Sequence, residues 1–392
     1  MSVRRWELAV ELMQRSVEHR EEPNWIGYAE FGERFVEHAV TEQRIIAAIS
    51  GMVGQGVSLG PVNIGPAGLA GFLAEGRVGT PRIARHDEAV VYHVTVPVTL
   101  AVKVLLGGKP LRLEAVVEID LTLRARTAAP VLIVIDIPPI EPEHVDFLVR
   151  ASAVDAALEW ALEPIAGLVR REVAQRVTAM LAEPRARRAR IFDIESLVDG
   201  RRARGPMPDR FEWIDYGEFG RKFFERVVTT RRIGEVVDRM GGRPIEIGPL
   251  RTGPGERATV TVRGAIGAPL LAEREPEGPH DEYHRFDLLV PVALDITVHV
   301  LRANRYRAEV EIPLLLTARA AEPLRVVIDP FPPKPEELRL HFKAEGVRAA
   351  TLGALAGIRK QVLARVLSVV KREIGRAEGR IIDVGARIDR VM

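Results

Sequence analysis

Apolar and polar residues alternate over two long neighbouring segments of the chain. VVYHVTVPVTLAVKVLL (90–106) and LRLEAVVEIDLTLRA (111–125) carry apolar side chains at nearly every second position, and GGKP (107–110) separates them. A period of two places successive side chains on opposite faces of a β-strand, so these segments predict a hairpin of long antiparallel strands. APVLIVIDIPPI (129–140) predicts a further strand that breaks at its Pro-Pro pair.

Helical patterns precede and follow this β region. Residues 28–50 place Phe31, Phe35 and other apolar side chains on or near one stripe, and glycines follow. Residues 144–182 predict a long closing helix that Pro164 can interrupt. The strands present one apolar face, which the two helices must cover.

The whole pattern occurs twice. WIGYAEFGERF (25–35) and WIDYGEFGRKF (213–223) are identical at seven of eleven positions, and VPVTL (96–100) matches VPVAL (290–294). A repeat of this length indicates an internal duplication of one structural unit. The second copy carries a few extra residues and ends in a predicted helix over about 335–376.

The repeat divides the chain into four predicted parts: an N-terminal helical extension (1–19), unit one (20–198), a linker (199–208) and unit two (209–392). The linker is rich in Gly, Pro and Arg, as connecting segments often are. The predicted fold class is α+β, with two tandem copies of a helix, a long bent antiparallel sheet and a long helix.

This architecture resembles the tubular lipid-binding (TULIP) superfamily, which includes the bactericidal/permeability-increasing proteins and bacterial phospholipid-binding relatives. The segments VSLGPVNIGPAGLAGFLAEGRVG (57–79) and IEIGPLRTGPGERATVTVRGAIG (245–267) carry the resemblance, together with the helices that open and close each copy. It covers both copies and is one of architecture, without a diagnostic motif. The resemblance implies an elongated apolar interior, or hydrophobic cavity, that holds a lipid.

Composition removes several classes of function. The 392 residues include no cysteine, which excludes disulfides, thiolate zinc sites, iron–sulfur clusters and cysteine nucleophiles. A net charge of +2 creates no global field for a polyanion, so we expect no nucleic-acid partner. The N-terminus lacks the apolar run of a signal peptide, and no apolar window is long enough to span a membrane. We therefore expect a cytoplasmic protein.

A polar triplet precedes the same strand in both copies. The two triplets are His86-Asp87-Glu88 and His280-Asp281-Glu282. Imidazole and carboxylate groups can ligate a metal, but consecutive strand residues point to opposite faces, so a polar turn is the favoured interpretation. HDEYH (280–284) is not a zincin motif, because Asp281 stands where that motif needs Glu and the segment leads into a strand. We predict no metal site and no cofactor.

Four residues are candidates for acid–base chemistry: Asp136, Asp329, His93 and His299. The two aspartates end matched strands beside prolines, where a carboxylate can cap backbone N–H groups or act as a catalytic acid in a cavity. Capping is the favoured interpretation. The chain has no GxSxG and no phosphate-loop motif, so we assign no catalytic residue.

An aromatic stripe opens each copy. Tyr28, Phe31 and Phe35 are spaced i, i+3 and i+7, on one helical face. Such a stripe either packs as core or lines an apolar tunnel, where aromatic walls suit lipid tails or polycyclic ligands. The candidate ligand-binding residues are Tyr28, Phe31, Phe35, Tyr216, Phe219, Phe223 and Phe224.

The leading hypothesis is a cytoplasmic, non-enzymatic protein that binds a lipid or another apolar or amphipathic small molecule between sheet and helices. One alternative is a pseudo-dimeric scaffold or assembly protein with filled cores and no ligand. Another is an enzyme that acts on an apolar natural product inside the cavity. The arginine-rich segment 184–210 can contact an anionic membrane surface or be a solvated linker, and the linker interpretation is favoured.

Overall fold

The structure is a computed structural model. It describes residues 23–64, 70–86, 90–106, 109–150, 156–200, 208, 210–238, 241–252, 257–278, 281, 283–299, 303–331, 333, 338–344, 362–369 and 380–391. The chain divides into two compact units. Gly32–Phe219 form the first unit, and Gly220–Arg390 form the second unit together with the chain up to Phe31.

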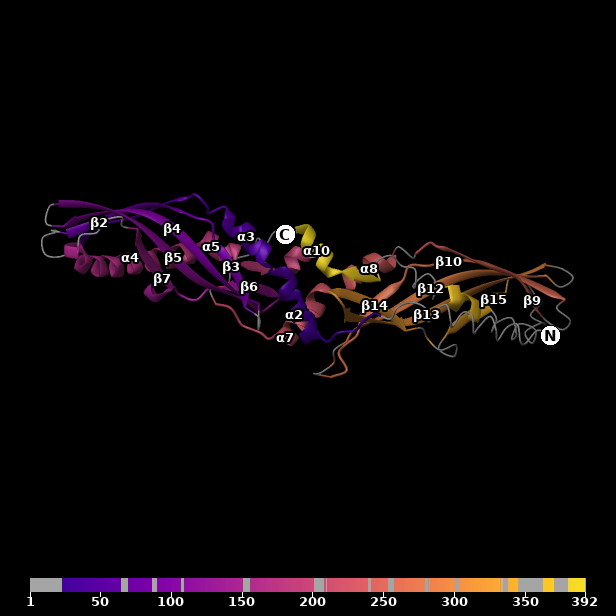
Figure 1. Cartoon of the computed structure of the whole chain (residues 1–392). Helices are drawn as coiled ribbons and strands as arrows, with labels where there is room; N and C mark the ends of the chain where they lie inside the picture. Colours follow the sequence, from indigo (N-terminus) through magenta and orange to yellow (C-terminus); the bar gives the residue numbers. More distant parts are fainter. Residues whose placement is uncertain are drawn as a thin grey trace. The chain divides into compact units, whose positions relative to one another are not determined.

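The first unit is built around an eight-stranded antiparallel sheet (Figure 1). Its strands run in the order β1 (Gly56–Ile64), β2 (Ala70–Val78), β4 (Val91–Leu106), β5 (Lys109–Ala128), β6 (Leu132–Asp136) and β8 (Ile191–Asp193), while β3 (Arg82–His86) pairs with β4 and β7 (Val145–Arg150) pairs with β5. Its other elements are α3 (Glu42–Ser50), the 3₁₀ turn η2 (Pro142–His144), α4 (Ala156–Ala182), α5 (Pro184–Ala189) and α6 (Ile194–Val198).

The second unit repeats this strand order. Its sheet runs β9 (Pro244–Thr252), β10 (Ala258–Ile266), β12 (His284–His299), β13 (Ala303–Ala321), β14 (Arg325–Phe331) and β16 (Ile381–Asp383), while β11 (Leu270–Glu273) pairs with β12 and β15 (Arg339–Ala344) pairs with β13. Helix α8 (Thr230–Val237), a helical stretch at 362–369 and α10 (Val384–Val391) complete its described elements. The α+β fold class with two matched units is therefore confirmed.

The predicted hairpin is β4 with β5, and its counterpart is β12 with β13. Pro97 lies opposite Glu118 in the first hairpin, and Pro291 lies opposite Glu311 in the second. These matching pairs align the two hairpins residue by residue. Burial alternates along β12 from His284 to His299, as expected for a strand with one face on the core.

Each compact unit includes a short segment from the other sequence copy. Trp213 forms an antiparallel bridge with Ala128 in the first unit, and Trp25 forms one with Ala321 in the second. The helices that follow these tryptophans, α2 (Tyr28–Ala39) and α7 (Tyr216–Val227), each continue from one unit into the other. The compact units therefore differ from the sequence copies over these two segments.

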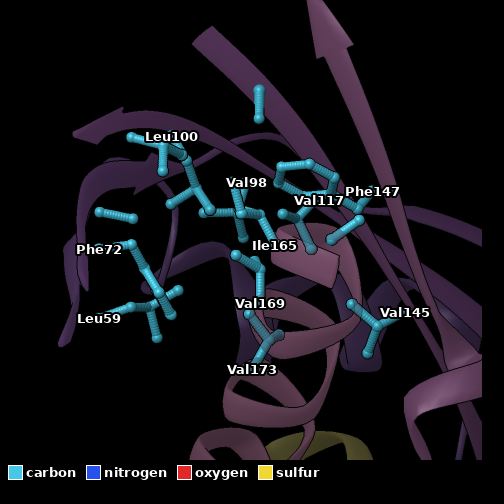
Figure 2. Packing of buried hydrophobic residues seen from close by; sticks show 14 of the residues in the cluster. Leu59, Phe72, Val98, Leu100, Val117, Val145, Phe147, Ile165, Val169 and Val173 are labelled. Carbon is cyan, nitrogen blue, oxygen red and sulfur yellow. The ribbon is translucent and has the colours of Figure 1, made fainter. Parts of the chain in front are cut away.

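The core of the first unit lies between its sheet and α4. Ile165, Val169 and Val173 project from α4 toward sheet residues that include Phe72 and Val117 (Figure 2). These positions of α4 are spaced by four residues, so they share one face of the helix. All five side chains are buried, and α4 thus covers the apolar face of the sheet.

The predicted helices are too long. Residues 145–150 are strand β7, because Val145 and Phe147 alternate into the core and pair with β5. Helix α4 begins at Ala156 and continues through Pro164 without interruption. In the second copy, the range predicted as helix includes strand β15, and residues 362–369 are helical.

The predicted opening helix (28–50) is two helices. Helix α2 ends at Ala39 and α3 begins at Glu42, with Thr41 as the N-cap. The Thr41 hydroxyl accepts a hydrogen bond from the Arg44 N–H at 3.4 Å, which satisfies one free donor of the new helix.

Candidate ligand-binding site

The predicted aromatic residues of the second unit pack against one another. The Tyr28 and Phe224 ring centroids are 4.8 Å apart, and those of Phe31 and Phe223 are 5.1 Å apart. Phe31 also meets Phe224 edge-on at 5.5 Å. All four side chains are buried, and these distances are typical of favourable aromatic pairs in a core.

The first unit contains the remaining predicted residues. Phe35 and Phe219 meet edge-on at 5.5 Å, and both are fully buried. Tyr216 is half-buried, and burial raises the pKa of its hydroxyl, with a smaller contribution from Glu33 and Glu37. The structure therefore places six of the seven predicted residues in packed ring clusters. Their contact with a ligand stays a prediction.

Gly32 of α2 and Gly220 of α7 lie where the backbones of these two helices approach each other closely. A Cβ on Gly32 would lie 2.3 Å from the Tyr216 carbonyl oxygen in the first unit. A Cβ on Gly220 would lie 2.3 Å from the Tyr28 carbonyl oxygen in the second unit. Glycine is thus required at both positions for close approach.

The space between the first sheet and α4 is filled where the structure describes it. Val169 is fully buried, and apolar side chains from β1, β2, β4, β5 and β7 surround this face of the helix (Figure 2). Protein interiors of this kind are packed about as densely as organic crystals. The predicted cavity between sheet and helices is not evident in this part of the first unit.

A pocket of about 630 Å³ lies on the second sheet, over strands β11 to β14. Leu270 is paired with Leu289, and Leu289 is paired with Pro313. In the neighbouring row, Leu315 is paired with Phe331. Directly opposed residues of a sheet point to the same side, so these side chains form two adjacent, mainly apolar rows. Asp287 lies within the second row, paired with Ala272 on one side and Leu315 on the other.

The pocket occupies the sheet face that is turned away from the core. On β12, Phe286 and Leu288 point into the core and are buried, whereas Asp287 and Leu289 alternate with them and point the other way. Residues of both rows are open to solvent. Leu270 is 64% exposed and Phe331 is 51% exposed.

The matching surface of the first sheet is polar. The leucine–proline pair of the second sheet is replaced by Thr95 and Asp120, whose side chains share a hydrogen bond of 2.6 Å. In the next row His93 lies opposite Thr122, with the Nδ1 and Oγ1 atoms 3.4 Å apart. The apolar pocket is therefore a property of the second unit alone.

An ion pair lies within the second row of the pocket. The Arg274 guanidinium donates to the Asp287 carboxylate at 2.6 Å and 3.2 Å. This hydrogen bonding and charge raise the pKa of Arg274. Because the two charges are paired, the floor of the pocket is apolar apart from one neutral ion pair within its second row.

One residue of each polar triplet lies within the described part of the chain. His86 ends strand β3 and is paired with Val91, whereas Asp281 lies in a turn. The Asp281 carboxylate accepts the N–H groups of Glu277 and Tyr283 at 3.0 Å and 3.1 Å and pairs with Arg285. Burial opposes ionisation of Asp281, but these hydrogen bonds and Arg285 lower its pKa overall. His280 lies outside the described residues.

Asp87, Glu88 and Glu282 also lie outside the described residues. Among the residues that are described, no group of three His, Asp or Glu side chains could hold a metal ion.

The acid–base candidates are not brought together. Asp136 lies 3.5 Å from Arg126, and Asp329 lies 2.6 Å from Arg380, so each aspartate has an arginine partner. His93 and His299 are exposed strand residues. The predicted capping of backbone N–H groups is not seen among the described residues, where each of the two carboxylates pairs with an arginine.

The apolar pocket was missed by sequence reasoning. Its signal was present in the β13 segment EIPLLLTARAAEP (311–323), where apolar residues interrupt the alternation of the strand. The matching first-copy segment, EIDLTLRARTAAP (118–130), keeps the alternation. Apolar residues on both faces of a strand indicate that each face is covered by another part of the protein or contacts a ligand or partner.

Comparisons with known proteins give the following results. No protein-family model matches the chain. No curated protein matches it either. Among solved structures, it is similar to the crystal structure of lipopolysaccharide binding protein, with 8% identity, a TM-score of 0.29, and coverage of 92% of this chain and 91% of that chain. It is also similar to P47 from Clostridium botulinum A2, with 9% identity, a TM-score of 0.24, and coverage of 90% and 88%. In the described part of the chain, we find no helix with the length and apolar character needed to cross a bilayer.

Proposed function

We propose that the protein binds a lipid or another apolar small molecule, and that the pocket on the second sheet holds it. The observation that carries the proposal is this pocket of about 630 Å³, which falls within the usual size range of ligand sites. Its lining is mainly leucine, proline and phenylalanine, with one ion pair within the second row.

The driving force is the removal of exposed apolar side chains from water. Leu270 and Phe331 are more than half exposed, and Leu289 and Leu315 are partly exposed. Burial of one such side chain contributes about 1.5–3 kcal/mol when it is complete. A ligand that covers both rows therefore gains enough free energy to offset the cost of immobilising it.

The proposal retains most of the expectation from sequence and changes the position of the ligand. It keeps a cytoplasmic protein with TULIP-like tandem units that arose by internal duplication. The matching strand orders of the two sheets support the duplication. The proposed binding position is the outer face of the second sheet instead of the space between sheet and helices. The reason is that α4 fills the corresponding space in the described first unit.

The test uses the neutral fluorescent probe N-phenyl-1-naphthylamine, whose emission rises in apolar surroundings. Substituting Leu289→Thr together with Leu315→Thr introduces polar side chains like those of the matching first-sheet positions, Thr95 and Thr122. We expect saturable binding by the natural protein and at least a tenfold weaker apparent affinity in the double variant. Ile381→Thr is the matched control, because Ile381 is a 54% exposed strand residue of the same sheet outside the pocket.

Organic extraction of the purified natural protein identifies the bound molecule by mass spectrometry. Recovery of a lipid that is lost from the double variant supports the proposal. Absence of any extractable ligand, combined with equal probe binding by the natural protein and the double variant, contradicts it.

The filled core also favours a second candidate function, a scaffold without a ligand. In that case a partner protein covers the apolar rows of the second sheet. Light scattering over a range of concentrations separates the two functions, because a self-associating scaffold shows a mass that rises with concentration and falls in the double variant.

A further inference from the structure

A second, smaller pocket lies in the first unit, where α4 ends. Its volume is about 290 Å³. Leu181 of α4 lines it, together with Pro138 and Pro139 from the segment after β6. Arg187 of α5 and Arg190, the residue that follows α5, complete the lining. The pocket therefore combines an apolar wall with two guanidinium groups.

The Arg190 guanidinium is held by neutral partners. Its Nη2 donates to the Leu181 carbonyl at 2.8 Å, and its Nε donates to the Ala186 carbonyl at 3.4 Å. Its pKa is lowered mainly by burial and further by the charge of Arg187, while Asp136 acts in the opposite direction. Within the described part of the unit, neither arginine forms an ion pair with a carboxylate.

In the second unit, the arginine that corresponds to Arg190 forms an ion pair with an aspartate. Arg380 corresponds to Arg190, since the Ile135 N–H donates to the Arg190 carbonyl and the Ile328 N–H donates to the Arg380 carbonyl, both at 2.8 Å. Arg380 binds the carboxylate of Asp329 directly at 2.6 Å.

In the first unit the corresponding aspartate, Asp136, pairs with Arg126 instead, at 3.5 Å. Arg187 has no basic counterpart, because the second copy has Ala377 at that place in the sequence. Compared with the second copy, the first copy has Arg187 in place of Ala377, and its Asp136 pairs with Arg126 instead of Arg190. Both changes leave positive charge without a matching anion.

We propose that this pocket binds an anionic group, a phosphate or carboxylate, that is carried on an apolar body. Arg187 and Arg190 hold the anion, since guanidinium groups bind carboxylate and phosphate through paired hydrogen bonds. Pro138, Pro139 and Leu181 contact the apolar part. The site belongs to the first unit, and the proposal is independent of the function proposed for the pocket on the second sheet.

The experiment is isothermal titration calorimetry of the full chain with octyl phosphate, below its critical micelle concentration. Arg187→Ala is the test variant, because the Arg187 side chain caps no backbone group and alanine stands at this place in the second copy. Arg188→Ala is the matched control. It removes the same charge from the next residue of α5, which is exposed and does not line the pocket.

We expect Arg187→Ala to weaken octyl phosphate binding about tenfold, and Arg188→Ala to change it less than twofold. Inorganic phosphate should bind at least tenfold more weakly than octyl phosphate, because it lacks the apolar contact. Octyltrimethylammonium, with the same tail and the opposite charge, should not bind.

Three results would overturn the proposal. One is an equal loss of octyl phosphate affinity in Arg187→Ala and Arg188→Ala. That result would indicate non-specific electrostatic attraction to the arginine-rich segment. Another is equal affinity for inorganic and octyl phosphate, which would remove the apolar contact. The third is an absence of saturable octyl phosphate binding by the natural protein.

Discussion

Gly32 and Gly220 are two residues at which close backbone packing leaves no room for a side chain. Each would place a Cβ 2.3 Å from a carbonyl oxygen, Gly32 against Tyr216 and Gly220 against Tyr28. A backbone atom cannot move aside as the end of a flexible side chain can. The identity of these two positions in both sequence copies thus follows from packing.

Substitution Gly32→Ala should destabilise the protein by about 1–3 kcal/mol, the usual cost of overpacking. The overlap with the Tyr216 carbonyl outweighs the gain in helix propensity. Urea unfolding followed by circular dichroism measures the change. Gly234→Ala is the control, because Gly234 lies in helix α8 with open space around its Cβ direction. That substitution should stabilise by about 0.5–1 kcal/mol, and equal losses in the two variants would contradict the packing argument.

His284 is a buried titratable residue of the second unit. Its ring stands edge-on to Phe286 at 4.8 Å. Its Nε2 lies 3.3 Å from the Glu273 carboxylate but outside hydrogen-bonding geometry. Burial lowers its pKa, whereas Glu273, Glu225 and a hydrogen bond with the Val228 backbone raise it by less. The folded protein therefore holds this imidazole neutral at a pH where an unfolded chain is protonated.

This arrangement predicts a loss of stability in mild acid. Below about pH 6.5 the unfolded chain takes up a proton on His284 that the folded chain does not. The contribution of neutral His284 to the free energy of unfolding is therefore complete above this pH. It decreases as the pH falls toward the pKa of His284 in the folded protein. The variant His284→Val, which introduces the residue found at Val90 of the first copy, should show a smaller fall in urea midpoint between pH 7 and pH 5. An identical pH dependence in both proteins would contradict the prediction.

Helix α4 is the element that closes the first unit. Its contact with the sheet rests on Ile165, Val169 and Val173, which recur every four residues on one helical face (Figure 2). Strand β7 leads into this helix and completes the apolar surface beneath it.

Truncation of Val169 to alanine should cost about 2 kcal/mol, since it removes two buried methyl groups and leaves a small void. Met180→Ala on the same helix should cost less than about 0.5 kcal/mol, because Met180 is exposed. Thermal or urea unfolding gives both values. A small effect of Val169→Ala would show that this face of α4 is loosely packed.

The sequence predicts strands better than helices in this chain, for a physical reason. The β4–β5 hairpin is confirmed because a period of two persists over both segments, which pair from Val91 with Arg124 to Leu106 with Lys109. Residues 145–150 were assigned to a helix because six residues are too few to separate the two periods, and their pairing with β5 depends on a distant segment. The break at Thr41 is a local capping effect that the apolar stripe does not reveal.

The candidate sites could be predicted only in part, because each depends on contacts between segments that are distant in the sequence. The aromatic stripe identified residues that are buried, but their partners come from a segment nearly 190 residues away. The apolar pocket needs four strands in lateral register before its two rows exist. Neither arrangement is contained in any single stretch of sequence.

At the scale of the whole molecule, the segments around the two tryptophans link the sequence copies. Arg126 lies 3.8 Å above the ring of Trp213, and Arg319 lies 3.9 Å above the ring of Trp25. The Thr127 hydroxyl donates to the Ile214 carbonyl at 2.6 Å. Each sheet is thus completed by a residue that belongs to the other copy.

Substitution Trp213→Ala should therefore loosen the first unit, although Trp213 lies in the second sequence copy. Hydrogen exchange measured by mass spectrometry should speed up over β5 and β6, because the bridge with Ala128 loses the ring that packs on Arg126 beside it. Trp25→Ala provides the reciprocal control, with faster exchange over β13 and β14 of the second unit. Faster exchange confined to the substituted residue's own sequence copy would contradict this assignment.

This exchange of segments has a consequence for biosynthesis. Trp25 leaves the ribosome about 300 residues before its partner, Ala321. At about 5–20 residues per second, it waits roughly 15–60 s for that partner. The first sheet also lacks its last segment until residue 219 has been made, so neither unit can be completed from its own copy as translation proceeds. Until Phe219, Phe223 and Phe224 have been made, the aromatic face of α2 lacks its partner rings, and a nascent-chain chaperone that shields it should increase the yield of folded protein.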